Sequence, residues 1–474
     1  MTSHTHRSKL PQLVFLLQAL ALFLLGSCSR IDHKQSALDP KGLVAQNQYD
    51  IFMLSVWITI FLFCAVGGCL LFVLWKYRAK SKEEAMEIPE QMHGSSKIET
   101  TLIIASAVIL VILAVPTLQG VVLMNRVPDP NDQATLEKLK LDKSQIEDAI
   151  TVNVTGKRFF WVFEYPQYGI VTANELVFPA SKAVRVNLRT EDVIHSFWLP
   201  KLAGKMDLMP GQENFLWFIA DEQKIRSGID KDGKPYEVDA KTAMPSVFDG
   251  KMRQTIFAKQ AFTDEFEAVG GLFYGQCAEY CGNSHAYMSF RALAQTDEDF
   301  DKWVLKFRNA QNPNLQPTAY SAENTYDEGT VVTYPDDDLG ENNRREFRAL
   351  KSTAKGQTPA TKPDLWEKVH SDDYEKGKIL FGTQGCAQCH AINKTGIGAK
   401  GPNLTLFGLR TSLAAGWMRN DEDSLDKWLR NSNEIKFGNL MWNGEGIDDR
   451  HPLRQLQDDD EKVSQLVTYL LGLK

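Results

Sequence analysis

The stretch GQCAEYCGNSHAYM, from Gly275 to Met288, holds two cysteines, a histidine, a glutamate and a methionine within fourteen residues. Cys277 and Cys281 are four residues apart, His285 follows four later, and Met288 three after that. This density of ligand side chains is compatible with a disulfide-closed turn, a zinc site or a soft-metal centre. Met is a poor zinc ligand, whereas thiolate, imidazole and thioether together suit copper.

Two bridging thiolates can hold two copper ions close enough to share an electron, and each ion then requires a terminal imidazole. Only one histidine is local, so another must come from elsewhere. A candidate is His195 in DVIHSFWLP, 82 residues before Cys277. A histidine beside apolar residues is more often a core residue, but the chain has only nine, and four lie near the N-terminus or between two apolar segments.

Length and charge limit the class of protein. A chain of 474 residues is too long for one core, so two or three domains are expected. The formal net charge of -7 and the lack of clustered Lys and Arg argue against nucleic acid as a partner. The seven cysteines do not resemble a scattered disulfide framework. They fall into four groups: Cys28, Cys64 with Cys69, Cys277 with Cys281, and Cys386 with Cys389.

The N-terminus has the pattern of an exported leader. A charged start is followed by an apolar run from Leu10 to Leu25 and by Leu25-Gly26-Ser27-Cys28. This tetrapeptide resembles a bacterial lipobox, which implies a lipoprotein-type signal peptide over residues 1–27, cleavage before Cys28 and acylation of its sulfur. The alternative is an uncleaved signal anchor with an incidental cysteine.

Residues 28–125 are predicted to form a transmembrane hairpin. The apolar segments at about 51–75 and 102–124 are long enough to cross a hydrocarbon core of about 30 Å. Five basic residues lie in or beside the connection between them, Lys76, Arg78, Lys80, Lys82 and Lys97, whereas acidic residues follow the second segment. The connection is therefore predicted to be cytoplasmic and everything beyond residue 125 to lie outside.

Residues 126–308 carry short alternating runs such as TVNVTG, KAVRVNLR and RQTIFAK, which favour an antiparallel β-sandwich or barrel. The polar stretch 221–250 reads as an inserted surface excursion, and EDFDKWVLKF predicts a helix. Residues 309–364 are rich in Asn, Pro, Thr, Asp and Lys, which predicts a mobile or loosely packed linker. Residues 365–474 have helical patterns that begin after Ser or Asp.

Cys386-Ala387-Gln388-Cys389-His390 is the attachment signature of c-type haem, with two thiols bonded to the porphyrin and His390 on the iron. The alternative is a redox CxxC or half of a zinc site. Downstream candidates for the second axial ligand are Met418, Met441 and His451. Met441 is favoured because KFGNLMW resembles the loop before the axial Met in small cytochromes c. GPNL, from Gly401, resembles the segment whose Pro carbonyl supports the proximal His.

The segment from about Gln46 to Arg308 resembles subunit II of haem-copper cytochrome c oxidases, because the paired apolar segments, DVIHSFWLP, KMDLMPGQEN and GQCAEYCGNSHAYMSF occur in order. The resemblance implies three parts: a two-helix transmembrane hairpin, a cupredoxin-like Greek-key β-barrel and a fused all-α cytochrome c domain. It also implies the dinuclear copper centre named CuA. The implied ligands are bridging Cys277 and Cys281, terminal His195 and His285, the weak ligand Met288 and the backbone carbonyl of Glu279.

Two acidic residues and one aromatic position carry further implications. The Glu279 carboxylate would point toward a magnesium site shared with subunit I, since a hard cation takes oxygen ligands. Glu99 resembles the family's acidic residue at the mouth of a proton path, although Glu at a helix start is also ordinary dipole chemistry. At Phe159 the family normally has a Trp that accepts electrons from docked cytochrome c. Either the fused cytochrome replaces a separate carrier, or any aromatic suffices to pack there.

The expected function is that of the subunit through which electrons enter a proton-pumping terminal oxidase of a bacterial inner membrane. Electrons would pass from an upstream cytochrome or quinol-oxidising complex through haem c and CuA to subunit I, where oxygen is reduced. Membrane lipid and the other oxidase subunits are the expected partners. The alternatives are a membrane-anchored copper chaperone or thiol oxidoreductase, and an electron-transfer subunit of a nitric oxide reductase.

Overall fold

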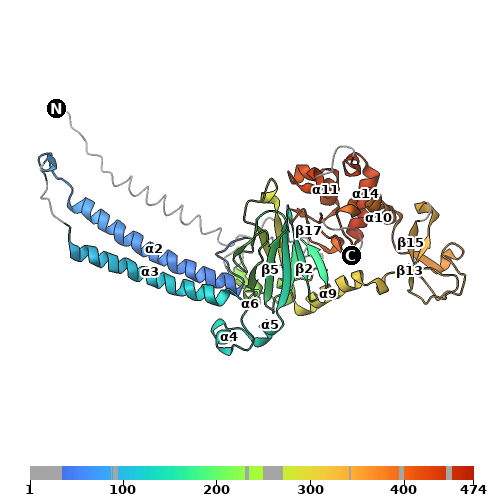
Figure 1. Ribbon diagram of the computed structural model, residues 1–474, viewed down its shortest axis with the longest axis horizontal. Helices are drawn as coiled ribbons and strands as arrows, with labels where there is room; N and C mark the ends of the chain where they lie inside the picture. Colours follow the sequence, from blue (N-terminus) through green and yellow to red (C-terminus); the bar gives the residue numbers. More distant parts are fainter. Residues whose placement is uncertain are drawn as a thin grey trace.

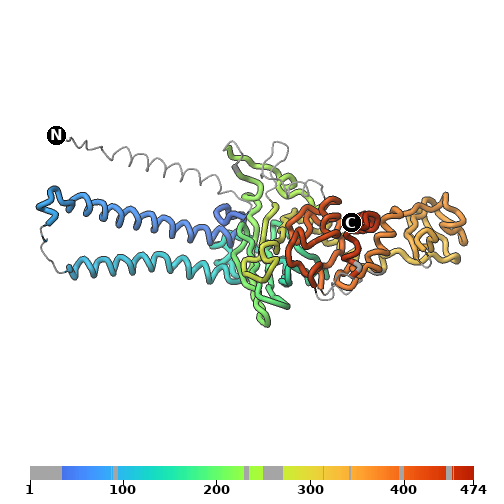
Figure 2. Tube along the Cα trace, turned by 90° about the horizontal axis from the view of Figure 1, so that it is seen from above, coloured from blue at the N-terminus to red at the C-terminus, as the bar shows by residue number. Residues whose placement is uncertain are grey.

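The computed structural model describes residues 35–86, 88, 94–229, 234–248, 271–340, 343–393, 400–444 and 451–474. A helical hairpin projects from one side of a central β-domain, and a helical domain and a small sheet follow on the opposite side (Figure 1). The perpendicular view has the same order along the long axis (Figure 2). The predicted leader, Cys28 and the predicted strand RQTIFAK lie outside the described residues.

The hairpin consists of α2 (Leu43–Lys76) and α3 (Ser96–Met124), and both helices are long and apolar enough to cross a membrane. They contain the two predicted spans. Helix α2 begins before its span, at the end fixed to the β-domain, whereas α3 begins before its span at the opposite end. The Leu43 amide donates to the Ile219 carbonyl at 3.1 Å, and the Trp217 indole donates to the Met124 carbonyl at 2.9 Å. Most side chains between these anchors are exposed and apolar, as expected for a lipid-facing surface.

The central domain contains two five-stranded sheets, β3-β2-β1-β5-β8 and β4-β12-β11-β6-β7. The pairs β1–β5 and β4–β12 are parallel, so the sheets are mixed and not purely antiparallel as predicted. The strands are β1 (Ile150–Lys157), β2 (Phe160–Tyr165), β3 (Ile170–Ala173), β4 (Glu175–Pro179), β5 (Val184–Thr190), β6 (His195–Trp198), β7 (Lys205–Leu208), β8 (Asn214–Phe218), β11 (Leu272–Cys277) and β12 (Ser289–Gln295).

Side-chain alternation explains how the sheets bury one face. In β5, Val184, Val186 and Leu188 are buried, whereas Arg185 and Arg189 point outward. Aromatic rings fill the space behind the Gly275–Met288 stretch, with Phe197 stacked on Phe290 at 4.5 Å between ring centroids and Trp161 5.5 Å from Phe290. This apolar layer gives the stretch a rigid base.

Short elements surround the sheets. They are α4 (Gln133–Leu139), α5 (Lys143–Glu147), α6 (Glu222–Arg226), β9 (Ser227–Ile229), β10 (Pro235–Glu237), α7 (Ala240–Ala243) and α9 (Asp297–Gln311). The β9–β10 hairpin lies in the described part of the predicted excursion at 221–250. Helix α9 is the predicted helix of EDFDKWVLKF, and it packs Phe300, Trp303 and Phe307 against the β-domain.

A four-stranded sheet takes three of its strands from the predicted linker, β13 (Thr318–Ala319), β14 (Val331–Pro335) and β15 (Arg344–Ala349), and the fourth, β16 (Trp366–Lys368), from just beyond it. Tyr326, Val332, Ala349 and Trp366 form its core, so the prediction of loose packing was wrong for the first three of these residues. The polar composition concealed a few widely spaced aromatic residues. Arg345 is fully buried and pairs with Asp336 at 2.7 Å and with Asp372 at 2.6 Å, which joins the sheet to the next helix.

The C-terminal domain is helical, as predicted. It contains α10 (Asp372–Thr383), β17 (Ser412–Leu413), β18 (Met418–Arg419), α11 (Glu422–Ile435), α12 (Leu440–Asn443), α13 (Pro452–Gln455) and α14 (Asp460–Gly472). Ser371 and Asp459 cap α10 and α14 through their side chains. The two helices touch at Gly377, where an added Cβ would lie 2.0 Å from the Gln465 carbonyl oxygen. Only glycine permits this approach.

Gly377→Ala is therefore expected to destabilise the C-terminal domain by about 1–3 kcal/mol or more, because the helix backbones must separate. Thermal unfolding of the full chain, followed by circular dichroism, measures the change. Gly382→Ala in the same helix is the matched control, since a Cβ there meets no described atom within 4 Å. It should be neutral or stabilise by about 0.5–1 kcal/mol. Equal unfolding temperatures for the two variants would contradict this account of the crossing.

Candidate functional site

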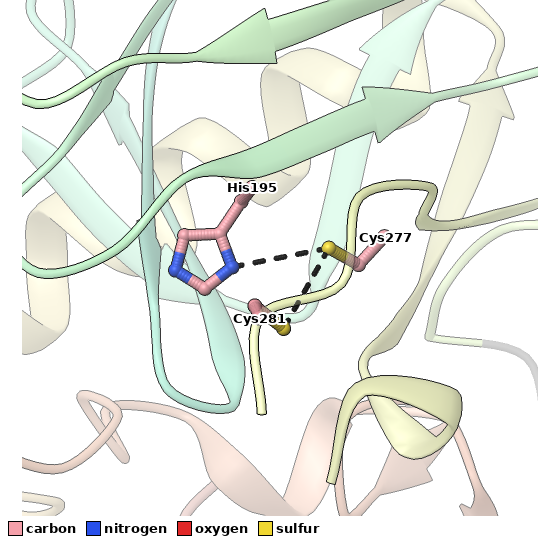
Figure 3. Close-up of side chains that lie close together, drawn as sticks. All are labelled: His195, Cys277 and Cys281. Atoms are coloured by element: carbon pink, nitrogen blue, oxygen red, sulfur yellow. Dashed lines mark hydrogen bonds between the residues drawn. The ribbon is translucent and has the colours of Figure 1, made fainter. Parts of the chain in front are cut away.

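Strand pairing brings His195 to the two cysteines. Cys277 ends β11 and His195 begins β6, and the pairing of these strands places Cys277 opposite Phe197. The His195 Nδ1 lies 3.8 Å from Cys277 Sγ, which lies 3.9 Å from Cys281 Sγ (Figure 3). Both cysteines are free thiols. The three side chains form a compact cluster with the dimensions of a metal site.

The remaining predicted ligands extend this cluster. His285 Nδ1 lies 3.7 Å from Cys281 Sγ, and Met288 Sδ lies 3.8 Å from the same sulfur. The carbonyl oxygen of Glu279 lies 3.2 Å from Cys277 Sγ. The turn is closed by the Cys277 amide, which donates to the Met288 carbonyl at 2.8 Å. All six predicted donors therefore meet in one place.

The donor set fits copper. Two thiol sulfurs, two imidazole nitrogens and a thioether are soft or borderline ligands, and both imidazoles turn the same ring nitrogen, Nδ1, toward the sulfurs. His195, Cys277, Cys281 and Met288 are at most 5% exposed. Hydrogen bonding with Cys281, helped by His195, lowers the pKa of Cys277, which favours the thiolate that a metal requires.

Asp192 holds His195 in place, a role not predicted from the sequence. Its Oδ1 lies 2.9 Å from His195 Nε2, and its Oδ2 accepts the Arg158 amide at 2.7 Å. Burial alone would raise the pKa of Asp192, but hydrogen bonds from His195 and from backbone amides outweigh burial and hold it well below its usual range. An ionised Asp192 fixes the ring so that Nδ1 faces the sulfurs. The sequence signal for this role was an acidic residue three positions before the candidate ligand His195.

The second site lies after α10. Cys386 and Cys389 flank a single turn, and both are half-buried free thiols. His390 Nδ1 lies 2.8 Å from the Pro402 carbonyl oxygen, the contact predicted from GPNL. This bond leaves Nε2 of His390 available to an iron ion. Two thiols and an oriented imidazole fit a covalently attached haem.

Comparisons with known proteins agree with both sites. Residues 38–119 match the transmembrane domain of cytochrome c oxidase subunit II, residues 169–230 match its periplasmic domain, and residues 374–474 match cytochrome c. The chain belongs to the cytochrome c oxidase subunit II family. Its C-terminal part is a fused cytochrome c domain.

Relatives of this subunit II chain extend over nearly its whole length. Cytochrome c oxidase subunit 2 of Alkalihalophilus pseudofirmus (strain ATCC BAA-2126 / JCM 17055 / OF4) is 28% identical over 97% of this chain and 96% of the relative. The protein of the same name from Bacillus sp. (strain PS3) is 29% identical over 97% of both chains. Quinol oxidase subunit 2 of Bacillus subtilis (strain 168) is 24% identical over 78% of this chain and 97% of the relative.

A solved structure, the periplasmic domain of subunit II of cytochrome oxidase from Bradyrhizobium japonicum, is 26% identical over 33% of this chain and 91% of that one, with a TM-score of 0.23. Membership of the subunit II family implies a CuA copper site, and the cytochrome c domain implies haem. The two apolar helices anchor the chain in a membrane, and the β-domain is the family's periplasmic domain.

Other predicted residues of this subunit II chain lie apart from the copper cluster. Met441 lies in α12 and packs against the cytochrome core. Met418 lies in β18. His451 caps α13, and its Nδ1 accepts the Leu453 amide at 3.2 Å. Glu99 is exposed in the first turn of α3.

Asp192→Asn is expected to weaken copper binding about 10–100-fold, because an uncharged amide holds the His195 ring less firmly. Copper retention by the full chain against a competing chelator measures the loss. Glu191→Gln is the neighbouring control, since Glu191 is exposed and pairs with Lys157 at 2.7 Å. Retention by Asp192→Asn equal to that of the control would refute the orienting role.

Proposed function

We propose that this chain is the subunit through which electrons enter a proton-pumping respiratory oxidase of a bacterial inner membrane. One observation carries the proposal: a single membrane-anchored chain brings together a six-donor soft-metal cluster and a haem-attachment site with an oriented histidine. Electrons arriving at the haem domain would leave through the copper site toward subunit I, where oxygen is reduced.

The proposed copper ligands are bridging Cys277 and Cys281, terminal His195 and His285, Met288 and the carbonyl of Glu279. When bound, the copper pair would accept and release one electron. The chain contributes ligands in fixed positions and surroundings that exclude water. Outer-sphere electron transfer requires that the ligands move little when the metal changes oxidation state, and it does not require acid-base groups. The aromatic layer of Trp161, Phe197 and Phe290 supports the ligand strands from behind.

For the haem, the proposed attachment residues are Cys386 and Cys389, with His390 and Met441 as axial ligands. The Pro402 carbonyl fixes the His390 ring through Nδ1. The role of His451 as a helix cap supports the choice of a methionine. The resemblance of KFGNLMW to the loop before the axial Met of small cytochromes c favours Met441 over Met418.

Subunit I and the other oxidase subunits are the proposed protein partners, and lipid surrounds α2 and α3. Glu99 would collect protons at the cytoplasmic end of α3, where its side chain is exposed. Glu279 turns its backbone carbonyl toward Cys277 while its side chain is exposed, so the carboxylate is free to bind a magnesium ion shared with subunit I. The external electron donor would be a cytochrome or a quinol-oxidising complex.

The burial of the cluster argues against the copper chaperone alternative. A chaperone must pass its metal to a partner, whereas His195, Cys277, Cys281 and Met288 are almost fully covered. A thiol oxidoreductase would have no use for the fused cytochrome domain. No observation on the described residues favours the nitric oxide reductase alternative.

Cys277→Ser is expected to abolish the purple and near-infrared absorption of the copper centre while the haem bands remain, because serine cannot replace a bridging thiolate. Visible and near-infrared spectra of the copper-loaded full chain provide the measurement. Cys64→Ser, in the exposed apolar part of α2, is the control and should keep both signals. Haem bands without copper absorption in the unaltered chain would rule out the copper assignment.

Met441→Ala should leave the haem covalently attached but lower its reduction potential and give a five-coordinate spectrum, because a thioether ligand raises the potential. Spectra and a redox titration of the full chain measure both effects. Met418→Ala removes a second thioether of the same domain and should change neither. A five-coordinate haem in Met418→Ala, with an unchanged Met441→Ala, would transfer the axial role to Met418.

A further inference from the structure

The cytochrome domain lies directly against the copper domain, and two contacts far apart in the sequence join them. In Figure 1, β17 lies beside the β-domain, and the perpendicular view in Figure 2 also places the two domains together. The first contact joins β4 to Thr411 and Ser412. The second joins the loop after α11 to the copper-ligand turn and to Phe159.

The first contact is centred on the Glu175 carboxylate, which is only 5% exposed. It accepts the Thr411 amide at 2.9 Å and hydroxyl at 2.6 Å, and the Ser412 amide and hydroxyl both at 2.8 Å. These donors, like the carboxylate, are almost fully buried. Hydrogen bonds to an ionised acceptor are roughly twice as strong as neutral ones.

Two buried arginines supply positive charge around Glu175. Arg291 is its partner across the β4–β12 pairing, and its guanidinium donates to the Gly416 carbonyl of the cytochrome domain. Arg410 lies on the cytochrome side, where burial lowers its pKa to about 10 and the Glu175 charge opposes that shift. The carboxylate is thus compensated from both domains, as a buried charge requires.

The second contact lies over the copper-ligand turn. Lys436, 3% exposed, donates from Nζ to the Phe159 carbonyl oxygen at 2.6 Å. The Ser284 hydroxyl, between the predicted ligands Cys281 and His285, donates to the Phe437 carbonyl. The loop that makes these bonds continues directly into α12 and Met441.

Buried charged groups favour one docked pose. Transient electron-transfer encounters rely on exposed charges at the rim of a small, hydrated interface. Here the Glu175 carboxylate and the Lys436 amino group are buried, and burial lowers the pKa of Lys436 to about 7. Each group meets its hydrogen-bond partners only in one position of the other domain. We propose that Glu175 and Lys436 are positioning residues that hold the cytochrome domain in a single pose, with the Met441 segment beside the copper-ligand turn. The consequence for electron transfer rests on the function proposed above.

Hydrogen exchange of the full chain, with both cofactors bound, tests the pose without measuring activity. Glu175→Ala should speed exchange of the Thr411 and Ser412 amides at least tenfold, since their acceptor is removed. Lys436→Met should also speed exchange at Thr411 and Ser412, although it touches neither, because both contacts hold one rigid domain. The matched controls are Glu213→Ala and Lys427→Met, which alter exposed side chains. Unchanged exchange at Thr411 and Ser412 in Lys436→Met would refute a single docked pose.

Haem-to-copper electron transfer after flash reduction of the haem gives a second readout. The unaltered chain should transfer at a rate independent of solvent viscosity, whereas the double variant Glu175→Ala/Lys436→Met should transfer at least tenfold more slowly and depend on viscosity, because its domain must dock again. Lys436→Arg should retain most of the rate. If the double variant loses its haem or copper spectrum, Glu175→Gln with Thr411→Val replaces it.

The two proposals fail in different ways. An unaltered chain that shows no haem-to-copper transfer would contradict the proposed function, while the exchange data would still decide the pose. A double variant with the rate, viscosity dependence and amide exchange of the unaltered chain would overturn the positioning role and leave the proposed function intact.

Discussion

The antiparallel pairing of β6 with β11 is the constraint on which the copper site depends. It places the His195 ring against Cys277, and the turn that follows Cys277 then needs only a few residues to bring Cys281, His285 and Met288 to the same point. A soft-metal centre requires this closeness before any metal arrives, because its ligands would otherwise have to be ordered at a conformational cost of about 1–2 kcal/mol per residue. The backbone hydrogen bonds of the strand pairs supply much of this order.

Side chains around the β6–β11 pair also hold the copper ligands in place. Phe197 and Phe290 stack between the sheets, Trp161 contacts both, and Asp192 fixes the outer face of His195. A hydrogen bond also orients the histidine of the cytochrome domain, where His390 contacts the Pro402 carbonyl. In His195 and in His390, one ring nitrogen makes a hydrogen bond to the protein. The other ring nitrogen is thereby left facing the metal position.

Most of the site residues could be predicted from local motifs, because ligands that belong to one turn are close together in the sequence. CAQCH, GPNL and the Gly275–Met288 stretch all lie as expected, and His195 was found because few histidines compete for its place. The small sheet at residues 318–368 was missed, since strands of two to six residues around scattered aromatic side chains carry no clear period. The contacts of Glu175 and Lys436 were not predictable either, because their partners are more than 230 residues away and belong to another domain.

In the docked pose, the fused cytochrome domain has a fixed orientation in addition to a covalent tether. A tether alone raises the effective concentration of a linked domain to about the millimolar range, which is ample for encounter. It does not select an orientation, and electron transfer depends on which face of the haem domain meets the copper site. Desolvating Glu175 and Lys436 is unfavourable unless each finds its partners, so these groups penalise every other orientation more than an apolar patch would. The Lys436 loop also covers Phe159, which is 7% exposed, so in this pose a separate carrier has no access to that position.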